Sequence, residues 1–359
     1  YNMDLVSKGG GRFPRDQKSI PLSKEVRDWL GVEEKEMGPD ELIRAILKAP
    51  VDLLWNGGIG TYIKASTEGH DEVGDRSNNA LRINGEDLQA KVVGEGGNLG
   101  FTQLGRIEYA RSGGRINTDS IDNSAGVDCS DHEVNIKIAL QDAVAKGKLD
   151  RESRNELLEK MTDDVARLVL IDNRLQAQAI TIAEHKGHKQ LEAQARLMHS
   201  MEQDGFLDRS VEFLPSDKQL NELRVAKKGL TRPELAILLS YSKLALYRDL
   251  QNSAMVSSDY FIADLVRYFP EAMQGKYREE ILSHRLRNDI VATIVTNSII
   301  NRAGITFAHS LIEENGMHPC DLARAYVITR DAFKLRELWG EIEALDGIVD
   351  GRTQAAMST

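Results

Sequence analysis

The spacing of hydrophobic and polar positions differs between two parts of the chain. Up to about residue 135, glycines separate short apolar runs, whereas the stretches beyond it have few glycines or prolines. In the second part, apolar residues recur every three or four positions, with Asp172 as the one polar break, at Leu158, Met161, Val165, Leu168, Leu175, Ala179 and Ile182. This stripe predicts an amphipathic helix that packs on other helices.

Further helices are expected in the second part. Residues 231–234 (TRPE) form a capping box with Pro233 in the first turn, and the helix that follows carries an apolar face of Leu235, Leu239, Leu246 and Leu250. Residues 289–301 predict another helix, and residues 324–345 predict one or two more. The small polar residues from Gly351 onward are expected to fray.

The first part alternates short helices with short apolar strands. Residues 39–48 predict a helix with Pro39 in its first turn, and Thr102 is expected to cap a second helix that runs to about residue 112. Residues 66–88 are polar and are expected to be mostly loop. Strands are expected at 51–55, which we interpret as buried, at 91–93 and at 115–119. Such alternation is typical of a parallel α/β sheet.

Composition and charge exclude some classes of function. The chain has 359 residues and a formal charge of −10, and this acidic excess disfavours broad binding to nucleic-acid phosphates or to anionic lipid. Its longest uncharged apolar stretch, residues 290–301, is shorter than the ~20 residues that a membrane span needs. The two cysteines, Cys129 and Cys320, form no disulfide framework and fit a reducing compartment, so we expect a cytoplasmic location.

Three glycine- or asparagine-rich loops follow the three predicted strands. Because open parallel sheets bind ligands at the carboxyl ends of their strands, we expect function to reside in these loops. Residues 130–133 (SDHE) form a second capping box, so a helix is expected to begin at Ser130 and to offer free N–H groups to an anion. The loops are NGGIGTY (56–62), GEGGNLGFTQ (94–103) and SIDNSAGVDCS (120–130). The second nearly matches the dinucleotide fingerprint G-x-G-x-x-G, but Leu99 stands where the third glycine should be.

The same loops carry a resemblance to a known family. KVVGEGGNLGFTQ (91–103), followed by DNSAGVDCSDHE (122–133), resembles the nicotinamide half of glutamate dehydrogenases, with Gly97 in place of an alanine and with Ser124 and Ala125 substituted. Longer runs resemble the large bacterial NAD-specific glutamate dehydrogenases over nearly the whole chain. They are SKGGGRFPRDQKSIPLS, VDLLWNGGIGTYIKAS, VGDRSNNALRING and RLRNDIVATIVTNSIINRAGITF.

This resemblance implies a fold and a reaction. It implies an incomplete Rossmann-like parallel sheet in the distal part of an NAD-binding domain (residues 1–140), followed by a mainly α-helical domain (141–359). The family oxidatively deaminates L-glutamate to 2-oxoglutarate and ammonium, with NAD as the cofactor. The catalytic lysines and aspartate and the phosphate-binding loop are expected upstream of this chain, so we expect no catalytic residue in it and an inactive isolated chain. The full-length protein is expected to form a homo-oligomer.

The resemblance also implies roles for individual residues. Asn123 would contact the nicotinamide amide or the substrate, and Ser130 would hydrogen-bond a substrate carboxylate. Cofactor contacts are implied for Gly57, Gly58, Glu95, Gly96, Gly97 and Asn98.

Each of these residues also has a structural interpretation. Ser130 could serve only as a helix cap, Asn98 and Asn123 could brace their loops, and Glu95 could act through charge or packing. Cys129 is expected to be a buried thiol. His70, His132, His185, His188 and His199 form no convincing ligand pattern, so no metal site is expected.

Two other functions stay open on the sequence alone. The chain could be a helical interaction or regulatory module with a non-binding remnant of a nucleotide fold, or it could belong to a dehydrogenase of another amino acid. Glycine and asparagine at three successive strand ends favour the dehydrogenase over the module.

Overall fold

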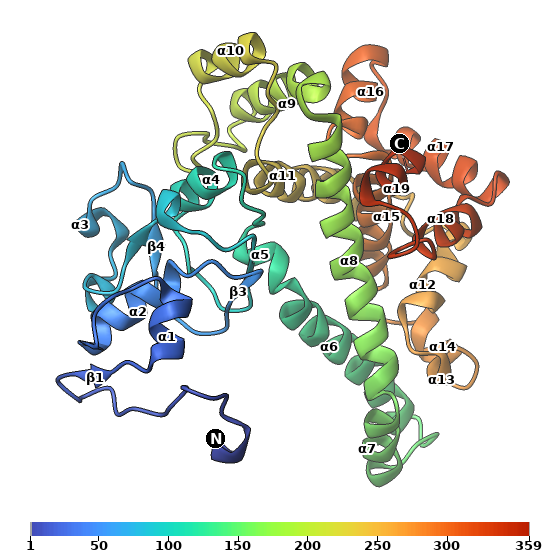
Figure 1. The fold of residues 1–359 in the computed structure, drawn as a ribbon. Helices are drawn as coiled ribbons and strands as arrows, with labels where there is room; N and C mark the ends of the chain where they lie inside the picture. Colours follow the sequence, from blue (N-terminus) through green and yellow to red (C-terminus); the bar gives the residue numbers. More distant parts are fainter. Residues whose placement is uncertain (1, 359) are drawn as a thin grey trace. The chain divides into compact units, whose positions relative to one another are not determined.

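The computed structural model describes residues 2–358, most of which are helical, and divides into two compact units (Figure 1). The first unit comprises Tyr1–Asn123 with Thr231–Pro233, and the second comprises Ser124–Leu230 with Glu234–Thr359. Arg232 belongs to the first unit, where its Nε donates a hydrogen bond of 3.0 Å to Asn117 Oδ1. The structure thus combines small two-stranded sheets, two of them parallel, with a large set of helices in the described residues. The functional boundary expected between residues 140 and 141 stays a prediction.

The first unit contains three small two-stranded sheets. β3 (Leu53–Asn56) runs parallel to β6 (Val92–Glu95), with Leu53 opposite Val92. The other pairs are β1 (Ile20–Pro21) with β2 (Glu36–Met37), which is antiparallel, and β4 (Ile63–Lys64) with β5 (Ile83–Asn84), which is parallel. The helices are α1 (Lys24–Leu30), α2 (Pro39–Leu47), α3 (His70–Val73), α4 (Gln103–Arg111) and α5 (Asp119–Asp122), with 3₁₀ turns at Met3–Leu5, Arg76–Asn78 and Gly85–Asp87.

The strand predictions are correct for two of three segments. β3 and β6 lie within one or two residues of the predicted bounds, and the two helices form where Pro39 and Thr102 predicted them. The third segment, 115–119, makes only a parallel bridge from Arg115 to Val92, because the chain turns into α5 at Asp119. The stretch expected to be loop, 66–88, holds several short elements instead, α3 and β5 among them.

The core of this unit lies between β4, β5, β6 and α4. It is formed by Ile63, Ile83, Leu88, Ala90, Val93, Phe101, Tyr109 and Ile116. The prediction that residues 51–55 are buried is wrong, because Leu53 and Trp55 are 56% and 60% exposed. β3 pairs with β6 on one side only, and no described element covers the face that carries these two side chains.

The second unit is helical. Its elements are α6 (Ser124–Ala145), α7 (Arg151–Lys160), α8 (Thr162–Lys186), α9 (Leu191–Gln203), α10 (Asp217–Ala226), α11 (Arg232–Gln251), α12 (Ile262–Tyr268), α13 (Glu271–Gln274), α14 (Arg278–Leu282), α15 (Arg287–Ala303), α16 (Phe307–Asn315), α17 (Pro319–Ala332), α18 (Leu335–Glu343) and α19 (Gly351–Met357), with 3₁₀ turns at Gly187–Gln190 and Asp259–Phe261. α8 packs along α6 and against α15. α11 buries the four leucines predicted for its core face.

Two helix predictions need correction. The apolar stripe over 158–182 is two helices rather than one, because the helix is interrupted at buried Met161, which ends α7 and precedes α8. The end of the chain does not fray at Gly351, because the Asp350 side chain accepts hydrogen bonds from the amides of Arg352 and Thr353 and so caps α19.

Among the described residues no single helix is long and apolar enough to cross a membrane; only α15 and α16 together reach that length and composition, with a bend of 91° between them.

A buried carboxylate joins helices of the second unit. Asp264 of α12 accepts a hydrogen bond of 2.9 Å from the fully buried Arg330 of α17, and it also pairs with Arg267 and Arg336. Burial alone would raise the pKa of Asp264, but the charges of the three arginines hold this pKa below its usual range. The ionised form is therefore the one that the folded state requires.

We expect Asp264→Asn to lower the free energy of unfolding at pH 7 by about 3–5 kcal/mol, because it removes the buried carboxylate that Arg330 shares with Arg267 and Arg336 and leaves Asp331 as the remaining carboxylate paired with the buried guanidinium of Arg330. Since the folded-state pKa is depressed, this advantage of the wild type should be lost as the pH falls from 3.8 through the lower folded value. Urea titration across pH measures both effects. Asp321→Asn is the control, because Asp321 pairs with Arg324 in solvent and should contribute less than about 1 kcal/mol. Equal losses in the two variants would contradict the assignment.

Candidate functional site

The loops that follow β3 and β6 are in contact. The amide of Gly97 donates a hydrogen bond of 2.9 Å to the carbonyl oxygen of Asn56. A Cβ placed on Gly97 would lie 2.3 Å from the carbonyl oxygen of Gly58, so only glycine permits this approach of the two backbones. The two glycine-rich loops therefore form one surface at the carboxyl ends of the parallel strands.

The third loop reaches the same place. Asn123, directly after α5, donates a side-chain hydrogen bond to Asn98 Oδ1. Asp119 and Asp122 of α5 accept hydrogen bonds from the amides of Leu99 (2.8 Å) and Glu95 (3.0 Å), respectively. Three turns that are distant in the chain thus meet, as the sequence predicted for the ends of the strands.

The amides at this meeting point keep free hydrogen-bonding capacity. Within the described residues, no further hydrogen bond uses Asn98 Nδ2 or Asn123 Oδ1, which leaves one donor group and one acceptor. Asn56 Nδ2 is buried at the end of β3 and has no partner, while Asn56 Oδ1 accepts from the amide of Gly58 at 3.3 Å. A donor beside an acceptor is complementary to a carboxamide.

The remaining predicted glycines have local roles as well. Gly57 and Gly58 are exposed, and Gly57 lines a pocket of about 250 Å³ together with Leu54, Asn56 and Tyr62. Gly96 lies against the indole of Trp55, where a Cβ would come within 2.5 Å of the ring. A side chain at Gly96 would therefore have to displace the indole of Trp55.

Glu95 is buried and pairs with an arginine of the neighbouring helix. Its carboxylate is fully buried and accepts two hydrogen bonds from the Arg106 guanidinium, at 2.7 Å and 3.0 Å. Arg106 also lies 3.3 Å from Asp119. Burial alone would lower the pKa of Arg106, but its hydrogen bonds with Glu95 and the nearby acidic charges raise it. The carboxylate of Glu95 thus ties β6 to α4 and is not available to a ribose hydroxyl.

Ser130 is not the helix cap that its capping box predicted. α6 already begins at Ser124, so Ser130 lies within the helix, exposed, and its hydroxyl donates a long hydrogen bond of 3.4 Å to the carbonyl of Gly126. The Ser124 hydroxyl instead accepts a hydrogen bond of 2.8 Å from Asn173. The neighbouring Cys129 is exposed, so the prediction of a buried thiol is wrong.

Sequence reasoning missed the residues that hold the loops together. Arg106, Asp119 and Asp122 fix the loops by hydrogen bonds, but each is an ordinary polar residue in or before a helix. Their partners are 11 to 27 residues away in the chain, so no local spacing reveals the pairing. A contribution of Ser130 to substrate binding stays a prediction.

Comparison with known proteins gives consistent matches. The family model described as "Bacterial NAD-glutamate dehydrogenase, catalytic domain" matches residues 1–183, and "Glutamate dehydrogenase, C-terminal" matches residues 227–359. The chain is 47% identical to the NAD-specific glutamate dehydrogenase of Halomonas elongata over 99% of its length, and 49% and 46% identical to the proteins of that name from Pseudomonas aeruginosa and Mycobacterium tuberculosis over 96%. It spans only 22%, 21% and 22% of these relatives.

We expect Arg106→Met to open the loop assembly, because the carboxylate of Glu95 would remain buried without a cation. The local free energy of opening, measured by hydrogen exchange of the β6 and α4 amides, should fall by about 3–5 kcal/mol. Lys91→Met is the control, because Lys91 pairs with Asp52 in solvent at 2.7 Å and should change the exchange by less than about 1 kcal/mol. Unchanged exchange at β6 in Arg106→Met would show that the pair does not hold the loops.

Proposed function

The chain belongs to the bacterial NAD-glutamate dehydrogenase family, and on that premise we propose that it forms part of an enzyme that converts L-glutamate, by oxidative deamination, to 2-oxoglutarate and ammonium. NAD supplies the acceptor of the hydride. One observation carries the proposal: Asn98 and Asn123, which are 25 residues apart in the chain, meet next to the close approach of Gly97 to Gly58 of the loop after β3.

The residues at the strand ends fit the nicotinamide end of the cofactor. The free donor on Asn98 and the free acceptor on Asn123 match the carboxamide of a nicotinamide, which has one acceptor and one donor group. Gly58 has open space where a Cβ would stand, so a flat ring would be able to approach the backbone there. Nothing comparable suits a pyrophosphate here, since the near-fingerprint of loop 94–100 has Leu99 at the position of its last glycine.

In this proposal the chain's own residues bind and orient. The two asparagine amides hold the ring by its carboxamide. The buried ion pair between Arg106 and Glu95 restrains the loops that carry them. Asp119 and Asp122 restrain the backbone of the second loop at Leu99 and Glu95. Loops that are fixed before the cofactor binds would hold the nicotinamide in the position that hydride transfer requires, and a misplaced ring would react more slowly.

Several finer parts of the proposal rest on the family resemblance. Ser130 would hydrogen-bond a substrate carboxylate from the first turns of α6, and the water and proton steps would use a lysine and an aspartate of the longer protein. The first unit would be the distal part of a Rossmann-like NAD-binding domain. A cytoplasmic location, a homo-oligomeric whole protein and the absence of nucleic-acid or membrane partners stay predictions.

The whole protein and this chain should behave differently. We expect the isolated chain to bind NAD weakly, if at all, in calorimetry and to produce no NADH from glutamate, because the phosphate-binding loop and the catalytic lysine are expected elsewhere. The full-length protein should turn over in the same absorbance assay. Turnover by the isolated chain would contradict the division of roles, and a full-length protein active on another amino acid but not on glutamate would change the proposed substrate.

In the full-length protein, Asn123→Ala should lower kcat/KM for glutamate by about 10- to 1,000-fold, because it removes an oriented polar contact at the reacting ring. The dissociation constant for NAD should rise, whereas the Tm should change little, since the Asn123 side chain is only half-buried. Asn221→Ala, at an exposed position of α10, is the matched control. If the kinetic constants equal those of the control, Asn123 only stabilises its loop and does not contact the cofactor or the substrate.

A further inference from the structure

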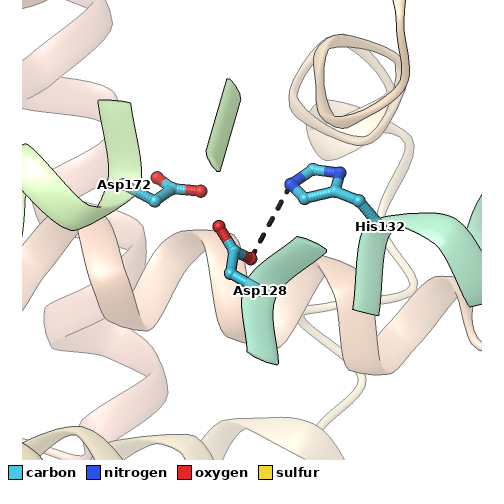
Figure 2. Close-up of side chains that lie close together, drawn as sticks. All are labelled: Asp128, His132 and Asp172. Atoms are coloured by element: carbon cyan, nitrogen blue, oxygen red, sulfur yellow. Dashed lines mark ion pairs between the residues drawn. The ribbon is translucent and has the colours of Figure 1, made fainter. Parts of the chain in front are cut away.

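Two helices of the second unit bring a histidine and two carboxylates together. Asp128 and His132 lie one turn apart on α6, and Asp172 projects toward them from α8 (Figure 2). One nitrogen of His132 and one carboxylate oxygen from each aspartate all lie within 4.8 Å of one another. The cluster therefore joins side chains from two packed helices at one point.

His132 is buried without any hydrogen bond. It is 1% exposed, and neither ring nitrogen has a hydrogen-bond partner. Its Nε2 lies 3.8 Å from Asp128 Oδ1, which is too long for a hydrogen bond, and Asp128 Oδ2 is also buried and unpartnered. Tyr268 stacks on the imidazole at 4.2 Å between ring centroids. Buried polar atoms normally find a partner, so these orphaned atoms point to one that is not part of the chain.

We propose that Asp128, His132 and Asp172 bind a divalent first-row transition metal ion such as Zn²⁺ or Mn²⁺. One imidazole nitrogen and two carboxylate oxygens are ligands that these ions accept, whereas Mg²⁺ and Ca²⁺ favour all-oxygen sites. Small rotations of the carboxylates would shorten the mutual distances to those around a single ion. Water would complete the coordination.

The charges of the cluster agree with this assignment. Burial lowers the pKa of His132 to about 4, so the ring is neutral at pH 7 and its lone pair is free to bind a metal. Burial, together with the charges of Asp172 and Asp131, raises the pKa of Asp128 to about 7. Burial also raises the pKa of Asp172. Two carboxylates that are costly to ionise in the apo protein would both be stabilised by a dication.

Within the described residues, Lys243 carries a positive charge that acts on both aspartates of the cluster. Burial lowers its pKa to about 8, in opposition to the charges of Asp172 and Asp128. Its ammonium donates a hydrogen bond of 3.4 Å to Gln176, and no ion pair within 4.0 Å joins it to either aspartate in the described part of the chain. Lys243 thus balances part of the charge while leaving the ligand atoms of both aspartates open.

A bound ion would fix α6 to α8. α6 is the helix that carries Ser130, so the ion would hold that helix in one position without entering the reaction. This site does not depend on the proposed dehydrogenase function, and its test needs no turnover.

The test is metal binding by the chelator-treated chain. Calorimetry with ZnCl₂ should give saturable, high-affinity binding of one ion per chain. MgCl₂ should not compete. Asp172→Asn should weaken Zn²⁺ binding by at least about tenfold, since it removes an anionic ligand. The matched control is Asp217→Asn, because Asp217 forms an aspartate–histidine contact of 2.7 Å with His199 on the surface, and it should bind as the wild type does.

A second measurement uses the wild-type chain alone, so it does not depend on whether a variant folds. Co²⁺ added to the wild-type chain should give visible absorption bands of a protein-bound ion, distinct from those of hexaaqua cobalt, and Zn²⁺ should abolish them. Absence of saturable Zn²⁺ binding would overturn the proposal, as would cobalt bands identical to those of the free ion. Equal Zn²⁺ affinity in folded Asp172→Asn and the wild type would also overturn it.

Discussion

The buried ion pair between Glu95 and Arg106 is the constraint on which the loops at the strand ends of the first unit depend. Glu95 ends β6 and Arg106 lies in the first turns of α4, so the pair sets the angle at which the chain leaves the sheet. Arg106 then reaches Asp119, and Asp122 accepts the amide of Glu95. A single guanidinium therefore connects the strand, the helix and the loop that ends at Asn123. Because it is buried, water cannot replace it.

Much of the architecture could be predicted from the sequence because it is encoded locally. Pro39 and Thr102 start helices through their own backbone restrictions and hydrogen bonds, and the leucines of α11 mark its buried face. The loops at the strand ends were correctly expected to be adjacent, because parallel strands bring their carboxyl ends to one edge. The contact between Asn98 and Asn123 needs α5 in addition, because Asn123 follows that helix rather than a strand.

The errors arise where tertiary contacts override local signals. The SDHE box has the composition of a helix start, yet the preceding residues are already helical, and Ser124 is held by Asn173 of α8. The stripe that ends in α8 was interpreted as core throughout, and Asp172 was its only irregularity. That irregularity was informative, since Asp172 faces a histidine that no spacing pattern connects with it. The one charged residue in the apolar stripe thus marked the place where polar side chains of α6 and α8 meet.

The open face of β3 has a practical consequence for anyone who handles this polypeptide by itself. Leu53 and Trp55 stand in water on a two-stranded ribbon whose outer edge has unpaired backbone groups. Such ribbons stick to copies of themselves, and the tendency grows with concentration and with salt. If copies of the isolated chain associate, this edge is therefore where the contact would begin.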